Sequence, residues 1–348
     1  MTDILKQDLH EIITDTNIPW HDLINSTVLI TGATGLVGRM LVRALSAANE
    51  YHNLNLQIIA CGRSEEKGNK LVLETGAEFL RGDVRDASLF SHIIRNVDYI
   101  FHCVAITKSA EMISKPVDVM TTEIDGTRNI LDLTQKKDCK SLVYLSSMEV
   151  YGQGLNGDTD ESKLGFIDLS NPRSSYPESK RFCEMLCTSY VTQFRTHVKI
   201  ARLAQTFGAG TPRDDTRVFA QFARSAINGE NIILHTEGKS RGNYCYTADS
   251  VRGLLTILLK GKNGDVYNVS NPVTSMTILE MAELVAREIG CGKISTSIDI
   301  SESANKIGYA PISKYRLNVD KLMSLGWEPS YGLNEMYKRL VTDWTFYT

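Results

Sequence analysis

The sequence predicts an α/β protein with a doubly wound parallel sheet up to about residue 204 and a smaller C-terminal α/β lobe after it. Two observations predict this fold class. Short, almost wholly apolar runs alternate with helical stretches, which is typical of a parallel sheet covered by helices on both faces. A glycine-rich turn joins the first apolar run to the first helix, as in Rossmann-type sheets that bind dinucleotides.

The elements follow one another in strand–helix order. The strands expected are Thr27–Thr31, Gln57–Cys61, Tyr99–Val104, Ser141–Ser146 and His197–Leu203, and the helices expected cover about 36–45, 64–75, 117–136 and 176–195. Apolar positions at helical spacing predict a further amphipathic helix within 3–24. Gly-, Asp- and Asn-rich stretches at 208–216 and 261–272 are expected to be loops.

Three regions follow from this pattern: an N-terminal helical extension (1–25), a Rossmann-type dinucleotide-binding domain (26–204) and a mainly substrate-binding lobe (205–348). The net charge of −3 argues against a nucleic-acid binder held by bulk positive charge. The seven cysteines form no CxxC pair, and the histidines are scattered, so no metal site is expected. The charged N-terminus and the absence of long apolar runs predict no leader and no membrane span, hence a cytoplasmic protein.

The turn after the first expected strand is suited to phosphate. Its residues are Gly32, Thr34, Gly35, Leu36, Val37 and Gly38, and a helix follows at once. Glycines let the backbone approach a pyrophosphate, and the helix N-terminus offers unpaired N–H groups and the positive end of its dipole. This arrangement predicts a dinucleotide site, although a plain tight strand–helix turn would have the same spacing.

The second expected strand ends without the carboxylate that would accept the 2′-hydroxyl of NAD. Arg63 stands there instead and could pair with the 2′-phosphate of NADP, so the cofactor is expected to be NAD or NADP, with a preference for NADP. Asp83, after another short strand, could accept a hydrogen bond from the adenine amino group.

A Ser/Tyr/Lys set provides candidate catalytic residues. Tyr176 and Lys180 are spaced i, i+4 on an expected helix, and Ser147 follows the strand at 141–146. A free tyrosine has a pKa near ~10, and a neighbouring ammonium favours the phenolate. Tyr176 is therefore predicted to act as a base, with Lys180 lowering its pKa and Ser147 orienting a substrate hydroxyl.

With these residues in place, the sequence resembles the extended short-chain dehydrogenase/reductase superfamily, in its NAD-dependent epimerase/dehydratase (nucleotide-sugar) family. The segments that carry the resemblance are TGATGLVG at 31–38, Asp83, Phe101 to Ala105, Leu145 to Gly152, Tyr176 with Lys180, and Leu325 to Ser330. They occur in the family's order and reach from about Ser26 to Trp344.

The resemblance implies an enzyme that oxidises a nucleotide-diphosphate sugar transiently at C4. It implies that Val84, Val104 and Ala105 join the cofactor site, together with Tyr176 and Lys180. The substrate residues that it implies are Thr107, Arg173, Gln205 and Arg241. It also implies a homodimer formed through the helices near 117–136 and 176–195.

The residues after Ser147 bear on the reaction. Family dehydratases have Asp-Glu there, whereas this chain has Met148 and Glu149, and a methionine cannot donate the proton that 4,6-dehydration requires. Glu149 and the Arg173-x-x-Tyr176 spacing resemble decarboxylases of nucleotide-linked uronic acids, with Glu149 as an auxiliary acid or base. Epimerisation and decarboxylation rank close together; a 4,6-dehydratase, an NADPH-dependent carbonyl reductase and a non-catalytic dinucleotide sensor are the alternatives.

Two departures from the family pattern stand out. Glu123 takes the place of an asparagine before Gly126-Thr127. The arginine that usually precedes a structural aspartate by seven residues lies eight before it here, as Arg241 and Asp249, so either a one-residue bulge restores its position or its role has moved.

Overall fold

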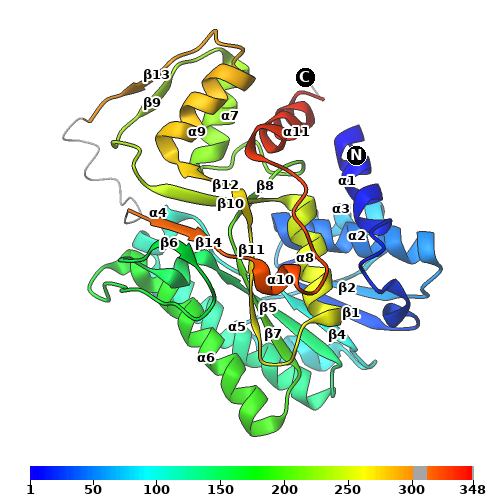
Figure 1. Ribbon diagram of the computed structural model, residues 1–348. Helices are drawn as coiled ribbons and strands as arrows, with labels where there is room; N and C mark the ends of the chain where they lie inside the picture. The colour runs from blue at the N-terminus through cyan, green and yellow to red at the C-terminus, as the bar shows by residue number, and fades with distance from the viewer. Residues whose placement is uncertain (301–311, 347–348) are drawn as a thin grey trace.

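The computed structural model describes residues 1–300 and 312–346 and has the predicted α/β architecture (Figure 1). A seven-stranded parallel sheet lies at its centre, in the order β11-β7-β5-β4-β1-β2-β3. Its strands are β1 (Thr27–Thr31), β2 (Gln57–Gly62), β3 (Glu78–Arg81), β4 (Tyr99–His102), β5 (Ser141–Ser147), β7 (Val198–Leu203) and β11 (Val266–Val269). The five expected strands are all present, and the strand order reverses between β1 and β4.

Helices cover both faces of this sheet (Figure 1). One layer consists of α5 (Pro116–Lys136) and α6 (Ser175–Phe194), and the other of α2 (Leu36–His52), α3 (Glu65–Thr75) and α8 (Thr247–Lys260). Alternate residues of β1 enter two separate cores: Val28 and Ile30 pack on the side of α2 and α8, and Leu29 on the side of α5 and α6. Because both faces are buried, the strands read as continuous apolar runs.

The chain returns to this sheet after residue 204. The stretch 261–272, expected to be a loop, contains β11, which pairs in parallel with β7 and forms the edge of the sheet. That expectation is wrong because a four-residue edge strand among Gly, Asn and Asp is too short to show a period. Residues 205–348 therefore form more than the smaller lobe. They also contribute β11 to the central sheet and α8, a helix that covers it.

The smaller lobe contains a three-stranded sheet in the order β12-β10-β8 and a two-stranded parallel sheet of β13 and β9. Its elements are β8 (Gln205–Phe207), α7 (Val218–Asn228), β9 (Ile232–Leu234), β10 (Arg241–Tyr246), β12 (Asn271–Thr277), α9 (Ile278–Leu284) with the π-helical turn η5 (Val285–Ile289), β13 (Thr296–Ile298) and α11 (Leu333–Thr345). Strand β8 runs parallel to β10, and β12 runs antiparallel to it. This lobe lies above the carboxyl ends of the central strands (Figure 1).

A second two-stranded pair ties the lobe to the sheet: β6 (Asn156–Thr159) runs parallel to β14 (Lys314–Leu317). The pairing of β10 with β12 is irregular between Gly242 and Tyr244, where one residue of β10 lies opposite four residues of β12. The extra residues therefore belong to β12, and the register shows no one-residue insertion in β10 before Asp249. The β10 residue at this point, Asn243, is fully buried; its side-chain amide donates to the carbonyl oxygen of Tyr315 at 3.1 Å and accepts from the amide of Leu317 at 3.0 Å. The remaining short helices are η1 (Trp20–Leu23), η2 (Ala87–His92), α4 (Ser109–Ser114), η3 (Met148–Tyr151), η4 (Pro172–Ser174) and α10 (Asp320–Met323).

The N-terminal extension begins with α1 (Asp3–Ile13), which packs against α2, α8 and α11. The helix is shorter than the expected span of 3–24 because Thr14 is its C-cap and a turn with Pro19 leads into η1. Asp8 is fully buried, 2.6 Å from the guanidinium of Arg339, and accepts a hydrogen bond from the hydroxyl of Tyr246. The extension therefore joins the sheet helices to the smaller lobe, and α1 and α11 lie on the same side of the molecule (Figure 1).

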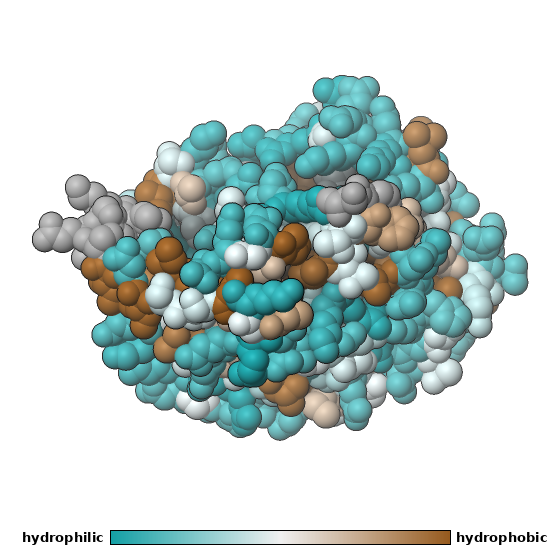
Figure 2. All heavy atoms as spheres, turned by 90° about the horizontal axis from the view of Figure 1, so that it is seen from above, coloured by the Kyte–Doolittle hydropathy of each residue, from teal (hydrophilic) through white to brown (hydrophobic). Residues whose placement is uncertain are grey.

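The face of the smaller lobe is mostly hydrophilic, with apolar side chains gathered near its middle and along one edge (Figure 2). Among residues 1–300 and 312–346, no helix is long and apolar enough to cross a membrane. Within the same residues, no cluster of three His, Cys, Asp or Glu side chains could hold a metal ion.

Candidate active site

The glycine-rich turn lies at the point where the strand order reverses, between the ends of β1 and β4. Gly32 has φ +67°, and a Cβ there would come within 2.8 Å of the backbone of Cys103, which follows β4. A Cβ on Gly38 would come within 2.4 Å of the carbonyl oxygen of Gly32. Gly35 is the N-cap of α2 and gives it no side-chain hydrogen bond. The first N–H groups of α2 are thus left for a ligand, and the turn fits a pyrophosphate.

The other predicted turn residues have supporting positions. Leu36 and Val37 are half-buried in the first turn of α2, and the side chain of Thr34 lies against Gly62 at the end of β2. Ala105, after β4, packs against the small apolar cluster that contains Tyr176. Val104, beside it, is half-buried. The turn after β4 thus connects the predicted phosphate site with the predicted base.

At the ends of β2 and β3, Arg63 and Asp83 face each other. The guanidinium of Arg63 is largely exposed and lies 3.9 Å from the Asp83 carboxylate. Arg85 holds the same carboxylate more closely, at 2.8 Å, and this hydrogen bond lowers the pKa of Asp83. Val84 is buried, and the side chain of Asn129 donates to its carbonyl oxygen. The two predicted adenosine residues therefore lie together, but Asp83 already has Arg85 as a partner.

Ser147, Tyr176 and Lys180 converge at the end of β5. The Ser147 hydroxyl accepts a hydrogen bond from the amide of Glu149 at 3.2 Å and interacts with the phenol of Tyr176. The ammonium of Lys180 lies 5.8 Å from the centre of the Tyr176 ring and donates to the carbonyl oxygen of Leu145 at 2.7 Å. Burial raises the pKa of Tyr176 above its ordinary value, and Lys180 and Ser147 offset part of that rise. The three side chains are therefore placed to stabilise a phenolate together.

Glu149 and Arg173 form a bidentate ion pair next to this trio. Two guanidinium nitrogens of Arg173 donate to the two carboxylate oxygens of Glu149, at 2.8 and 3.0 Å. The Arg173 side chain is 8% exposed, and that of Glu149 is 27% exposed. Burial alone would lower the pKa of Arg173, but Glu149 outweighs this effect and the pKa is raised. Such planar, charge-assisted pairs hold a carboxylate in a defined orientation.

The other predicted substrate residues are spread around the entrance. Thr107 is exposed after β4. Gln205, at the start of β8, has a buried side-chain oxygen to which the described residues offer no hydrogen-bond donor. Arg241, at the start of β10, donates to the carbonyl oxygen of Ser275 at 2.8 Å. Of the predicted substrate residues, Arg173 forms an ion pair with the predicted catalytic residue Glu149. The substrate roles of Thr107, Gln205 and Arg241 stay predictions.

Comparisons with known proteins identify the family. The sequence model of the NAD-dependent epimerase/dehydratase family matches residues 28–270. UDP-glucuronic acid decarboxylase 3 of Arabidopsis thaliana is 31% identical over 311 residues, which are 89% of this chain and 86% of that protein. The chain belongs to the NAD-dependent epimerase/dehydratase family. The family predicted from the motifs is confirmed.

Solved structures of other proteins share this family's fold. An epimerase from Methanothermobacter thermautotrophicus has a TM-score of 0.79 and 20% identity, covering 95% of this chain and 96% of that one. The dTDP-glucose 4,6-dehydratase DesIV of Streptomyces venezuelae, solved with NAD bound, has a TM-score of 0.75 and 22% identity, covering 91% of this chain and 96% of that one. At these identities the likeness concerns the fold, and it confirms the predicted Rossmann-type architecture.

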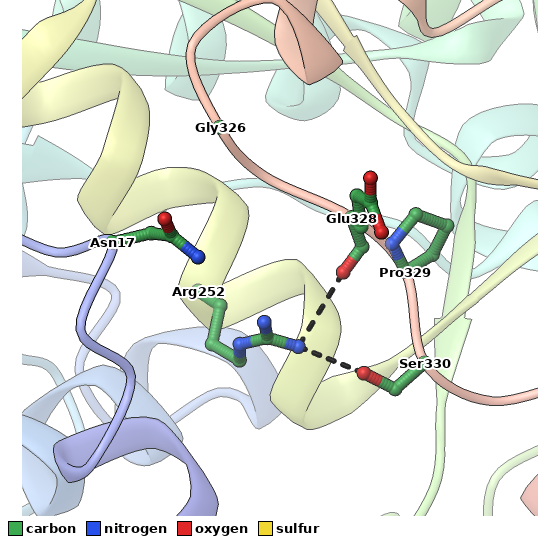
Figure 3. Close-up of a pocket in the computed structure, with 6 residues that line it drawn as sticks. All are labelled: Asn17, Arg252, Gly326, Glu328, Pro329 and Ser330. Carbon is green, nitrogen blue, oxygen red and sulfur yellow. Dashed lines mark hydrogen bonds between the residues drawn. The ribbon is translucent and has the colours of Figure 1, made fainter.

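The C-terminal segment typical of the family has a structural role in this member. The indole of Trp327 donates to the carbonyl oxygen of Asp249, and the amide of Ser330 donates to the Asp249 carboxylate. Arg252 lies in a hollow beside this segment and donates to Ser330 and to the carbonyl oxygen of Glu328 (Figure 3). Its guanidinium also binds Asp15 of the N-terminal extension at 2.7 Å. Arg252 of α8 therefore connects the N-terminal extension with the C-terminal segment.

Two residues near the reacting group were not predicted as part of the site. Glu123 of α5 lies 2.9 Å from the ammonium of Lys180. The only sequence signal for it is its departure from the family's asparagine. Tyr315 of β14 donates from its hydroxyl to the carbonyl oxygen of Met148, which braces the turn that carries Glu149. No motif indicates Tyr315, because its contact depends on how the smaller lobe folds back.

Proposed function

We propose that this protein is an NAD(P)-dependent nucleotide-sugar enzyme whose reaction is the decarboxylation of a nucleotide-linked uronic acid after oxidation at C4. The observation that carries the proposal is the Glu149–Arg173 pair beside Ser147 and Tyr176. The decarboxylases among the relatives support the same choice. When bound, the nicotinamide cofactor would accept a hydride from C4 of the sugar and return it at the end of the cycle.

The residues that would hold the cofactor are those of the turn 32–38, with Arg63 and Asp83 at its adenosine end. A side chain at Gly32 or Gly38 would collide with neighbouring backbone, so these glycines allow the tight turn that brings the N-terminus of α2 to the pyrophosphate position. Arg63 is largely exposed, and the nearby Asp83 carboxylate is held more closely by Arg85 than by Arg63. We therefore propose that the protein prefers NADP to NAD.

Proton transfer is the work of Ser147, Tyr176 and Lys180. Ser147 would hold the C4 hydroxyl by a hydrogen bond, and the phenolate of Tyr176 would take its proton as C4 is oxidised. The Lys180 ammonium stabilises the phenolate because it is buried close to the Tyr176 ring. Tyr176 would return the proton when the C4 carbonyl is reduced.

Glu149 and Arg173 would act in the second stage. A C4-oxidised uronic acid is a β-keto acid, and it loses carbon dioxide as its C5–carboxyl bond breaks and an enolate forms. Glu149 would orient the sugar, Arg173 would fix the position of the Glu149 carboxylate, and C5 of the enolate would take its proton from water. This role needs no metal ion and no second external reagent.

Epimerisation is the second candidate. Arg241 donates to the carbonyl oxygen of Ser275 and lies eight residues before Asp249 instead of seven, which does not favour an arginine dedicated to a uronate carboxylate at this position. An epimerase requires no such arginine. Dehydration is disfavoured because Met148 is buried, cannot donate a proton and uses its carbonyl oxygen to bind Tyr315. A carbonyl reductase would consume NADPH stoichiometrically, and a non-catalytic sensor would need no Ser/Tyr/Lys trio.

We further propose a homodimer in the cytoplasm. Helices α5 and α6 pack side by side and expose apolar side chains: Val117, Met120, Phe182 and Met185. Such a patch is typical of a subunit interface. The cysteines are free and five of them are buried, as expected in a reducing compartment.

The proposal is tested by incubating the purified protein and NAD or NADP with a panel of nucleotide sugars and uronic acids. A loss of about 44 mass units, the mass of carbon dioxide, from a nucleotide uronic acid is the expected result. An unchanged mass with altered ring couplings in NMR would establish epimerisation instead. No turnover of any nucleotide sugar, with dinucleotide still bound, would favour the sensor.

A further inference from the structure

A buried carboxylate lies directly behind the predicted base. Glu123 of α5 and Lys180 of α6 form an ion pair of 2.9 Å, and their side chains are 0% and 1% exposed. One carboxylate oxygen of Glu123 contacts both Lys180 and the hydroxyl of Tyr144. To the other oxygen, the described residues offer no hydrogen-bond donor. A carboxylate removed from water is costly unless its charge is compensated, so this pair is closely coupled.

Several titratable groups surround the Lys180 ammonium, and only Glu123 among them is a carboxylate. From α6 come Tyr176, Cys183 and Cys187; from α5, Glu123; from β5, Tyr144; and from the end of β4, His102 and Cys103. Burial lowers the pKa of His102 to about 3, so this side chain is neutral at working pH. Burial raises the pKa of Cys183 to about 11, so the thiol is neutral as well. Burial raises the pKa of Glu123 itself, whereas Lys180 lowers it, and Glu123 is the carboxylate that balances the charge of Lys180.

We propose that Glu123 is a positioning residue that keeps Lys180 protonated and sets the pH range in which Tyr176 accepts a proton. The proposal deepens the proposed function and rests on it for its effect on turnover. Its effect on Lys180 itself does not depend on which substrate is used.

The sign of the effect follows from electrostatics. Burial alone would lower the pKa of Lys180, but Glu123, with smaller contributions from Tyr176 and Cys183, outweighs burial and the pKa is raised. Burial also raises the pKa of Tyr176, and the negative charge of Glu123 adds to that rise. Turnover needs Lys180 protonated and Tyr176 ionised, so Glu123 moves both limbs of the pH–rate profile to higher pH.

The first test compares pH profiles of kcat for the wild type, Glu123→Gln and Asp125→Asn. Glu123→Gln keeps the size of the side chain and removes its charge, so both limbs should move to lower pH by about one unit or more. Asp125→Asn removes a charge from a partly exposed side chain on the same helix, 3.5 Å from Arg128, and should leave the profile in place. An unmoved profile in Glu123→Gln, with cofactor affinity and melting temperature retained, would reduce the pair to a structural salt bridge and overturn the proposal.

A second measurement needs neither turnover nor a variant of Glu123. The Lys180 Cε signal of protein labelled with ¹³C-lysine, assigned by its loss in Lys180→Arg, reports the protonation of Lys180 directly. We expect its midpoint in the wild type to lie above 10.5, the ordinary value for lysine. A midpoint below 10.5 would contradict the proposal, even if Glu123→Gln cannot be purified. If no nucleotide sugar is turned over, the proposed function fails while this titration still decides the role of Glu123.

Discussion

Replacing Tyr176 by phenylalanine removes one oxygen atom from the centre of the proposed site. The ring is 6% exposed and packs against Met112 and Val119, so phenylalanine should fill the same space. What is lost is the group that takes the proton, together with its interaction with Ser147. The variant therefore separates proton transfer from folding and from cofactor binding.

The expected size of the effect follows from these contacts. A positioned general base contributes about 10²–10⁴ to the rate, so kcat should fall about a thousandfold, or ~4 kcal/mol of barrier. The neighbouring Glu149 carboxylate is bound to Arg173 on both oxygens and is not free to replace the phenolate. Dinucleotide affinity should change only a few-fold, because one neutral hydrogen bond contributes about 1 kcal/mol.

The assay follows product formation by mass spectrometry under single-turnover conditions, with dinucleotide affinity measured by calorimetry. Tyr190→Phe is the matched control, since it makes the same change on the same helix, where the hydroxyl contacts only Asp132 among the described residues. We expect wild-type turnover from this control. A kcat for Tyr176→Phe within tenfold of the wild type would refute the assignment of Tyr176 as the base.

Three further predictions concern other parts of the structure. Gly32→Ala places a Cβ 2.8 Å from a neighbouring backbone, at a residue with φ +67°. We therefore expect the free energy of unfolding, measured in urea, to fall by about 2–4 kcal/mol. Gly35→Ala is the control and should cost less, because the nearest atom to its Cβ is 3.3 Å away. Arg63→Ser should weaken NADP binding about 10–100-fold and leave NAD binding nearly unchanged, as measured by calorimetry. An equal loss of affinity for both dinucleotides would contradict the NADP preference. Burial raises the pKa of Asp8 from 3.8 to about 7, so between these pH values the native state binds a proton that the unfolded state does not. The free energy of unfolding should therefore fall by about 2–3 kcal/mol as the pH rises from 5 to 8. Asp8→Asn should flatten that slope, and an unchanged slope would exclude Asp8 as its source.

Much of the fold could be predicted because its signals are local. The apolar strand β1, the glycine turn and α2 are consecutive in the chain, and each is defined by the residues next to it. The edge strand β11 gave no such signal, since it is short and its partner β7 lies far away in the sequence.

The same distinction between local and long-range signals applies to the residues of the candidate site. Tyr176 and Lys180 are one helical turn apart, so their proximity follows from the sequence. Glu149 and Arg173 are 24 residues apart, and their bidentate pairing depends on the turn after β5 meeting the start of α6. The pairing of Glu123 with Lys180 requires α5 and α6 to pack closely, which no spacing rule within one helix could indicate.

The central claim is that one site oxidises the sugar at C4 and then restores C4. The most direct measurement uses UDP-glucuronic acid carrying deuterium at C4, with the protein and a limiting amount of dinucleotide, followed by mass spectrometry and NMR of the product. The account predicts a product that retains the deuterium at C4, with many turnovers per dinucleotide and no accumulation of NADH or NADPH. Loss of the deuterium from the product, or consumption of one dinucleotide for each sugar converted, would contradict it.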